Sequence, residues 1–227
     1  DVTDPWYMSD EYSRYHQKGV NHTITNGKIT AKVSFEGCIS FFNQNGELLT
    51  EEYWRNRNRI NRYCVPLRVE ARELKCYQGS TDYELTARFE AFDDEKIFGM
   101  GQYQEKNLNK KGAVLELAHR NSQASVPFML SSRGYGFLWN NPAIGTATFG
   151  INKTEWYAKS TKKLDYFITA GDPPAEIEEN YTAATGRAPK MPEYGLGYWQ
   201  CKLRYRNQQE LLEVARKHKK LGLPMDA

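Results

Sequence analysis

The 227-residue sequence contains no apolar run of about 18 residues, the length that a membrane-spanning helix needs. Residues 1–6 are polar and lack the apolar centre of a signal peptide, although a signal that has already been removed leaves the same appearance. The sequence has only four cysteines, at positions 38, 64, 76 and 201, with neither a short repeating spacing nor the close grouping of a zinc site. We therefore expect free thiols in a reducing, cytoplasmic compartment, no membrane partner, no metal and no cofactor.

The sequence also lacks a strong excess of charge of either sign. Lys and Arg total 31 and Asp and Glu total 28, and the resulting net charge of +3 is too small to imply an anionic partner. One run, residues 53–63, combines Trp54 with four arginines and could bind RNA or a phosphate. Because the rest of the chain offers no wider basic field, we interpret the run as a solvated loop and expect no nucleic-acid partner.

Alternation of apolar and polar residues dominates the sequence from residue 21 to residue 172. Ile29, Ala31, Val33 and Phe35 would share one face of a half-buried strand. Similar short segments follow at hairpin spacing, at residues 38–42, 47–49, 66–71, 83–91, 97–101, 113–117, 126–130, 137–139, 146–151, 155–159 and 164–169. About a dozen short strands at this spacing predict a sandwich of two antiparallel sheets.

The Gly-Met-Gly segment at residues 99–101 follows a predicted strand and so invites comparison with a dinucleotide-binding loop. The third glycine of that motif is missing, with Gln104 in its place, and residues 106–112 form a turn where a helix would be required. We therefore predict that the two glycines serve a tight bend.

The chain changes character after residue 172. Pro174–Thr185 has the spacing of a helix, and residues 186–192 read as a linker, so we assign residues 1–20 to an N-terminal arm, 21–172 to the β-sandwich domain and 173–192 to a helix and linker. Residues 195–203 then predict a strand, and Asn207 caps a helix that ends before Gly222.

A strand, a helix and a second extended segment form a βα unit that needs a parallel neighbour. We therefore expect residues 193–227 to be the start of a β/α domain that the chain does not complete. The apolar faces of this unit would lack a partner within the chain, so we expect an exposed apolar patch and consider a homo-oligomer possible.

Several motifs carry a resemblance to glycoside hydrolase family 31, the α-glucosidase and α-xylosidase family. Gly197–Tyr205, the helix after Asn207 and Gly222–Asp226 resemble the first strand and helix of its catalytic barrel. Phe98–Gln102, Leu117–Asn121 and Val126–Leu138 resemble its N-terminal β-domain, in the family's order. The resemblance implies a mainly β fold: an antiparallel β-sandwich domain followed by the first βα unit of a truncated (β/α)8 barrel.

The resemblance also implies a function. Members of the family are retaining α-glycosidases that hydrolyse terminal α-linked sugars. The resemblance does not decide whether the sugar is glucose or xylose. In the family the nucleophile and the acid come from later barrel strands, so we predict no catalytic residue in this chain and no activity for the chain alone. The alternative is a non-catalytic carbohydrate-binding β-sandwich module, which would leave residues 195–227 unexplained.

Four residues are predicted to contact a carbohydrate substrate. Arg120 and Asn121 match a loop that relatives send from the β-domain over the barrel mouth. Many relatives carry aspartate where this chain has Asn121, which can donate and accept hydrogen bonds but brings no charge. Lys202 and Leu203 match the carboxyl end of the first barrel strand, where barrel enzymes place their chemistry. For His119 we favour local hydrogen bonds over a role in the site.

Overall fold

A computed structural model of the chain describes residues 22–34, 37–53 and 69–227. The predicted N-terminal arm, residues 54–63 of the arginine-rich run and residues 66–68 of a predicted strand lie outside the described residues. The chain divides into two compact units, with the division after Ala184, and each unit is described by itself.

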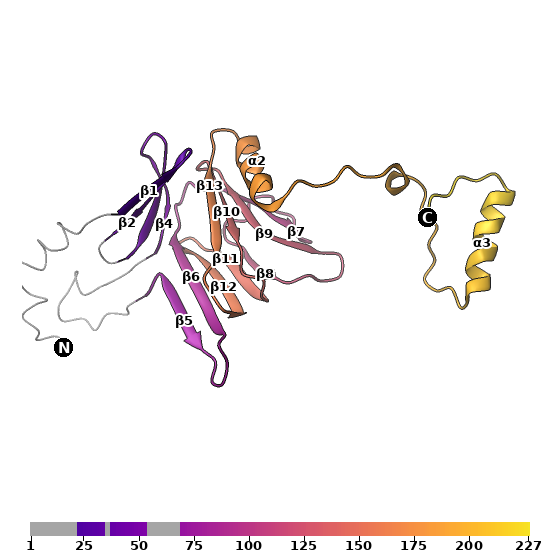
Figure 1. Cartoon of the computed structure of the whole chain (residues 1–227), viewed down its shortest axis with the longest axis horizontal. Helices are drawn as coiled ribbons and strands as arrows, with labels where there is room; N and C mark the ends of the chain where they lie inside the picture. The colour runs from indigo at the N-terminus through magenta and orange to yellow at the C-terminus, as the bar shows by residue number, and fades with distance from the viewer. Residues whose placement is uncertain (1–21, 35–36, 54–68) are drawn as a thin grey trace, which may run out of the picture. The chain divides into compact units, whose positions relative to one another are not determined.

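The first unit is built almost entirely of antiparallel strands (Figure 1). The strands are β1 His22–Asn26, β2 Ile29–Val33, β3 Ile39–Asn43, β4 Leu48–Glu51, β5 Arg72–Cys76, β6 Tyr83–Glu90, β7 Ile97–Gln102, β8 Val114–Leu117, β9 Ala124–Ser131, β10 Tyr135–Trp139, β11 Gly145–Phe149, β12 Lys153–Thr161 and β13 Tyr166–Ala170. The predicted mainly β class with antiparallel sheets is confirmed.

The number of sheets differs from the prediction of two. The strands form a four-stranded sheet in the order β1-β2-β3-β4, a second in the order β13-β10-β9-β7, and a five-stranded sheet in the order β5-β6-β12-β11-β8. Alternation in the sequence identifies which residues face a core, but it does not identify which strands pair. Of the predicted strand at residues 66–71, the described residues 69–71 lie outside the named strands, and β5 begins at Arg72.

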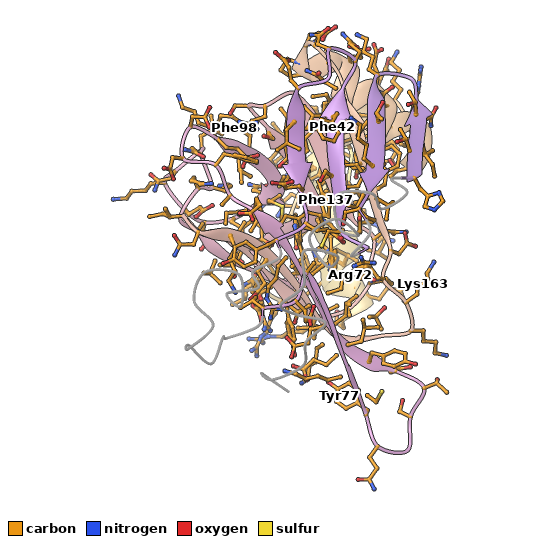
Figure 2. All side chains as sticks on the ribbon, turned by 90° about the vertical axis from the view of Figure 1, so that its left-hand side faces the viewer. Phe42, Arg72, Tyr77, Phe98, Phe137 and Lys163 are labelled. Carbon is orange, nitrogen blue, oxygen red and sulfur yellow. The ribbon has the colours of Figure 1, made fainter. Side chains whose placement is uncertain are left out.

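The core lies where the inner faces of these sheets meet. On β6, Leu85, Ala87 and Phe89 are buried while the residues between them are half-buried, as expected for one core-facing side. Phe137 of β10, labelled in Figure 2, belongs to this core. Its ring stacks on that of Trp156 of β12 at a centroid separation of 5.1 Å. Aromatic side chains contribute a large share of the apolar area that such a core removes from water.

The Gly99–Gly101 segment forms the predicted bend, as a bulge in β7. Gly99, Met100 and Gly101 have φ of 86°, 70° and 89°, in the left-handed region that favours glycine. A Cβ atom on Gly101 would lie 2.2 Å from the carbonyl oxygen of Ala124, so a larger residue could not fit without moving β9. The bulge also shifts the register between β7 and β9.

Helices follow the last strand. Helix α2, Pro174–Thr185, has the predicted bounds and buries Ile177. Helix α3, Gln208–Lys220, begins after the predicted cap, because Oδ1 of Asn207 accepts a hydrogen bond from the backbone N–H of Glu210 at 2.9 Å. The Glu210 carboxylate completes the arrangement by accepting from the backbone N–H of Arg206 at 2.7 Å.

The prediction of a strand at residues 195–203 is wrong. Residues Glu193–Leu196 form a short 3-10 helix, η3, and residues 197–203 are assigned to no strand. The backbone N–H of Asp226 donates to Tyr198 O at 2.9 Å, and that of Gln200 donates to Ala227 O at 2.8 Å. These bonds link the two segments, but neither segment is assigned to a strand.

The second unit exposes large apolar side chains. Leu196, Trp199 and Leu203 are 79%, 56% and 94% exposed. This agrees with the expected apolar patch, and association through it stays a prediction. In the part of the chain that the structure describes, no helix is long and apolar enough to cross a membrane.

Candidate functional site

The loop that carries Arg120 and Asn121 crosses between two sheets. It leaves β8, at the edge of the five-stranded sheet, and enters β9 in the four-stranded sheet that contains β7 and β10. The backbone N–H of Gln123 donates to the carbonyl oxygen of Arg120 at 3.1 Å, and Ser122 has a positive φ of 63°. A non-glycine residue in this region of φ marks a tight turn that its surroundings hold in place. We call residues 118–123 the β8–β9 loop.

The Arg120 guanidinium is fixed by the carboxylate of Glu116. Its Nε lies 3.0 Å from Oε2, and its Nη2 lies 2.5 Å from Oε1. This two-point hydrogen bonding holds the pKa of the Glu116 carboxyl below its ordinary value. Both side chains are exposed to solvent, so the pair orients Arg120 without adding much to stability.

The Asn121 side chain is exposed and makes no hydrogen bond to any residue that the structure describes. The turn is closed by the backbone and not by this amide. Both the donor and the acceptor of the amide therefore face solvent, where they could meet a hydroxyl group of a ligand.

His119 has the local partner that the sequence analysis favoured. Its Nδ1 accepts a hydrogen bond from the backbone N–H of Ser125 at 3.3 Å, which ties the start of the loop to β9.

Lys202 and Leu203 lie in the second unit, apart in the chain from the β8–β9 loop, and form no strand end there. The Lys202 ammonium pairs with the Glu210 carboxylate of α3 and lies 5.2 Å from the centre of the Tyr205 ring. Leu203 is 94% exposed. Two of the four predicted residues therefore belong to the first unit and two to the second.

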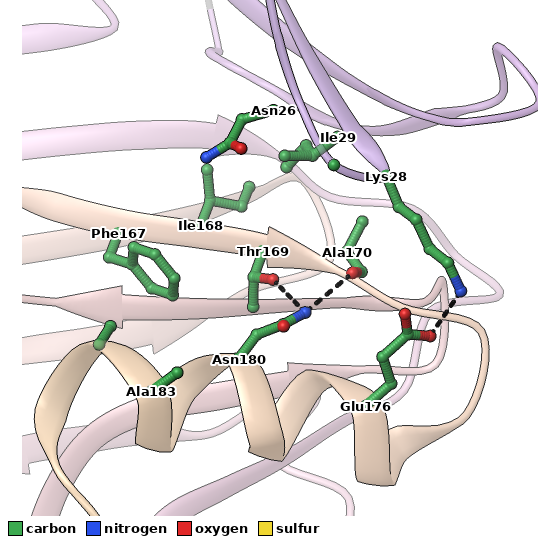
Figure 3. A pocket seen from close by; sticks show the side chains of 12 residues that line it. Asn26, Lys28, Ile29, Phe167, Ile168, Thr169, Ala170, Glu176, Asn180 and Ala183 are labelled. Carbon is green, nitrogen blue, oxygen red and sulfur yellow. Dashed lines mark hydrogen bonds and ion pairs between the residues drawn. The ribbon is translucent and has the colours of Figure 1, made fainter.

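A groove in the first unit was not predicted from the sequence. It has a volume of about 350 Å³ and lies between the β1–β2 turn, β13 and α2 (Figure 3). Lys28 Nζ lies at one end of the groove, 2.7 Å from Glu176 Oε2, and Asn180 Nδ2 donates to Thr169 Oγ1 at 3.0 Å (Figure 3). The same ammonium lies 2.8 Å from Asp172 Oδ2. These polar groups satisfy one another, so we interpret the groove as a structural junction.

A shallower cavity of about 510 Å³ lies beside the β5–β6 hairpin, lined by Tyr77, Asp82, Ile144 and Lys159 among others. The Tyr77 hydroxyl is already used there, because it donates to Lys159 O at 2.6 Å. Among the described residues, no group of three His, Cys, Asp or Glu side chains could hold a metal ion.

Comparison with known families identifies the class of protein. Residues 7–146 match the glycosyl hydrolase 31 N-terminal galactose mutarotase-like domain, and residues 188–227 match the glycosyl hydrolases family 31 TIM-barrel domain. The chain belongs to glycosyl hydrolase family 31.

Individual relatives point in the same direction. The chain is 50% identical over 212 residues to the uncharacterized family 31 glucosidase ORF2 of Pseudescherichia vulneris, covering 89% of this chain and 40% of that protein. It is 33% identical to α-xylosidase A of Aspergillus niger, covering 89% of this chain and 28% of that protein. The chain thus spans 40% or less of the length of these relatives.

Solved structures show the same likeness. The crystal structure of a family 31 α-xylosidase from a soil metagenome, complexed with xylose, is 55% identical, with a TM-score of 0.79 over 92% of this chain and 33% of that one. The xylosidase from Aspergillus niger is 32% identical, with a TM-score of 0.75 over 91% of this chain and 29% of that one.

Proposed function

We propose that this chain is the N-terminal portion of a retaining α-glycosidase, with α-xylosidase as the first candidate activity and α-glucosidase as the second. The observation that carries the proposal is the likeness of 92% of the chain, at 55% identity, to an α-xylosidase complexed with xylose. The glucosidase of Pseudescherichia vulneris, at 50% identity, supports the second candidate.

The chemistry of a retaining glycosidase requires one carboxylate that attacks the anomeric carbon and one carboxylic acid that protonates the leaving oxygen. In this proposal later barrel strands of the whole enzyme supply both groups. The chain described here contributes binding and orientation of the sugar, which lower the barrier only if they place the substrate accurately.

Two pairs of residues form this chain's share of the proposed pocket. Asn121 bonds a sugar hydroxyl with its amide, while Arg120 stays oriented by Glu116 beside it. From the second unit, Lys202 and Leu203 contribute to the pocket of the whole enzyme, where the exposed Leu203 side chain supplies an apolar wall without hydrogen bonds. The support for these roles is the availability of the Asn121 amide and the exposure of Leu203.

The full-length enzyme is expected to prefer an α-xyloside to an α-glucoside. The two sugars differ by one hydroxymethyl group, and a pocket that excludes such a group discriminates by about 10- to 200-fold in kcat/KM. Initial rates on nitrophenyl α-xyloside and nitrophenyl α-glucoside, at substrate concentrations below KM, measure this ratio. The opposite ratio would select α-glucosidase, and no turnover of either substrate would favour the carbohydrate-binding module.

Asn121→Ala in the full-length enzyme is expected to lower kcat/KM on the preferred substrate by about tenfold to a little over a hundredfold. The variant leaves a substrate hydroxyl unpaired in a site that excludes water, which costs about 1 to 3 kcal/mol. The melting temperature should change little, because the amide has no partner in the described residues.

Asn45→Ala is the matched control for this variant. Asn45 is an exposed asparagine in the β3–β4 turn of the same unit, so its removal should leave both kcat/KM and the melting temperature unchanged. If Asn121→Ala behaves like Asn45→Ala, Asn121 does not belong to the substrate pocket.

A further inference from the structure

The Tyr103 hydroxyl lies between the two strands that carry the β8–β9 loop. Tyr103 directly follows β7, and its hydroxyl donates to the carbonyl oxygen of Glu116 on β8 at 2.7 Å. The same hydroxyl lies 2.8 Å from Oγ of Ser125 on β9. Since β8 and β9 belong to different sheets, this one side chain joins both ends of the loop across the gap between sheets.

The two residues that Tyr103 contacts are also the residues that hold the loop's side chains. The Glu116 carboxylate binds the Arg120 guanidinium at 3.0 and 2.5 Å. The Ser125 backbone N–H donates to Nδ1 of His119 at 3.3 Å. A shift of β8 against β9 would therefore move the side chains on both sides of the loop at once.

The β7 bulge places Tyr103 at this position. Gly101 pairs with Ser125 across the register shift, and its close approach to Ala124 leaves no room for a side chain. Tyr103 follows two residues later and packs, half-buried, against the core. Burial is the main cause that raises the pKa of its hydroxyl above the ordinary value, so the group keeps its proton and remains a hydrogen-bond donor.

We propose that Tyr103 is a positioning residue for the proposed substrate pocket: it fixes β8 against β9 and so sets where the β8–β9 loop presents Asn121. Tyr103 itself does not touch the substrate. The inference rests on the proposed function, because the position of the loop affects turnover only if Asn121 reaches the sugar.

The test is Tyr103→Phe in the full-length enzyme, which keeps the ring in the core and removes only the hydroxyl. Loss of the hydroxyl removes its contacts with both Glu116 and Ser125 and should lower kcat/KM on the preferred substrate by about three- to tenfold. Amide hydrogen exchange of residues 117–125 should become faster by a similar factor, because opening of the loop costs less.

Tyr77→Phe is the matched control. Tyr77 lies at the end of the β5–β6 hairpin (Figure 2), and its hydroxyl also donates to a backbone carbonyl, that of Lys159, at 2.6 Å. The variant deletes a tyrosine hydroxyl bound to a backbone carbonyl elsewhere in the unit, so it should change neither kcat/KM nor the exchange of residues 117–125.

Combining Tyr103→Phe with Asn121→Ala separates a positioning role from a general structural role. If Tyr103 acts through Asn121, the Tyr103→Phe change should cost less than about twofold in kcat/KM once Asn121 is already alanine. An equal cost in both backgrounds would overturn the inference, and so would unchanged loop exchange in Tyr103→Phe. If Asn121→Ala alone leaves kcat/KM unchanged, the proposed function of the loop fails first, and the role of Tyr103 fails with it.

Discussion

The 227 residues alone are expected to turn over no α-glycoside, whatever sugar they still bind. A retaining glycosidase needs two carboxyl groups about 5 to 5.5 Å apart, one ionised as the nucleophile and one protonated as the acid. The chemistry requires both groups in one accessible site. Among the described residues, the carboxyl groups that share a cation and the one carboxyl group with a raised pKa are the ones to compare with this requirement. None of them meets it.

Among the residues of the first unit that the structure describes, two pairs of carboxylates share a cation. Asp172 and Glu176 both bind Lys28, and the hydrogen bonds from Lys28 lower the pKa of both carboxyls. A side chain with a depressed pKa holds no proton at neutral pH and cannot serve as the general acid.

The second pair is Glu73 and Glu155, which both bind Arg88, at 3.0 and 2.7 Å. The hydrogen bond from Arg88 lowers the pKa of Glu73. Burial acts to raise the pKa of Glu155, but hydrogen bonds from Lys153 and Arg88 outweigh it and the net shift is downward. This pair therefore lacks an acid as well.

Glu52 alone, among the described carboxyl groups with a shifted pKa, is shifted upward, chiefly by burial. Its side chain is 1% exposed, lies 3.1 Å from Nε of Arg72 and accepts from the backbone N–H of Ile39 at 3.0 Å. Such a group supports the packing of the sheets and is closed to a sugar.

The measurement is an assay of the purified 227-residue chain beside the full-length enzyme on nitrophenyl α-xyloside and α-glucoside. A mock purification from cells that lack the gene controls for host glycosidases. Turnover by the short chain above that background would overturn the assignment of the catalytic carboxylates to later barrel strands.

The elements that the sequence predicted well are those with local causes. Helix α3 carries its start signals in Asn207 and Glu210 and its stop signal in Gly222, and the structure ends the helix where these signals place it. The β7 bend was predicted from Gly99 and Gly101 for the same reason. Each of these features depends on residues within a few positions of one another.

The features that the sequence did not predict depend on distant partners. The hydrogen bond between Lys28 and Asp172 joins residues 144 positions apart, and no local sequence pattern predicts it. The division into three sheets also depends on distant residues. The alternation of apolar and polar residues along a strand does not depend on which strand pairs with it, so it does not identify the neighbour. For the candidate site, the sequence indicated the loop of Arg120 and Asn121, but not the Tyr103 hydroxyl that joins its ends.

Trp156→Ala is expected to be among the most destabilising single substitutions in the chain. Trp156 lies on β12 between β6 and β11 and is 0% exposed. Its ring stacks on Phe137 at 5.1 Å and on Trp139 at 5.8 Å, and meets Phe149 edge-on at 5.7 Å. Replacing a buried large aromatic by alanine costs about 3 to 5 kcal/mol, which corresponds to a fall in melting temperature of about 6 to 20 °C for a unit of this size.

Urea unfolding of the 227-residue chain, followed by near-ultraviolet circular dichroism, measures this loss, and two variants calibrate it. Trp156→Phe keeps an aromatic ring against Phe137 and should lose less than half as much as Trp156→Ala. Ile151→Ala removes a side chain that is 70% exposed in the neighbouring β11–β12 turn, and should change the free energy of unfolding by no more than about 0.5 kcal/mol. The order of the three losses depends on the contacts described for Trp156. If Trp156→Ala proved as mild as Ile151→Ala, the five-stranded sheet could not pack against β10 through this ring, and the arrangement of the core would have to be revised.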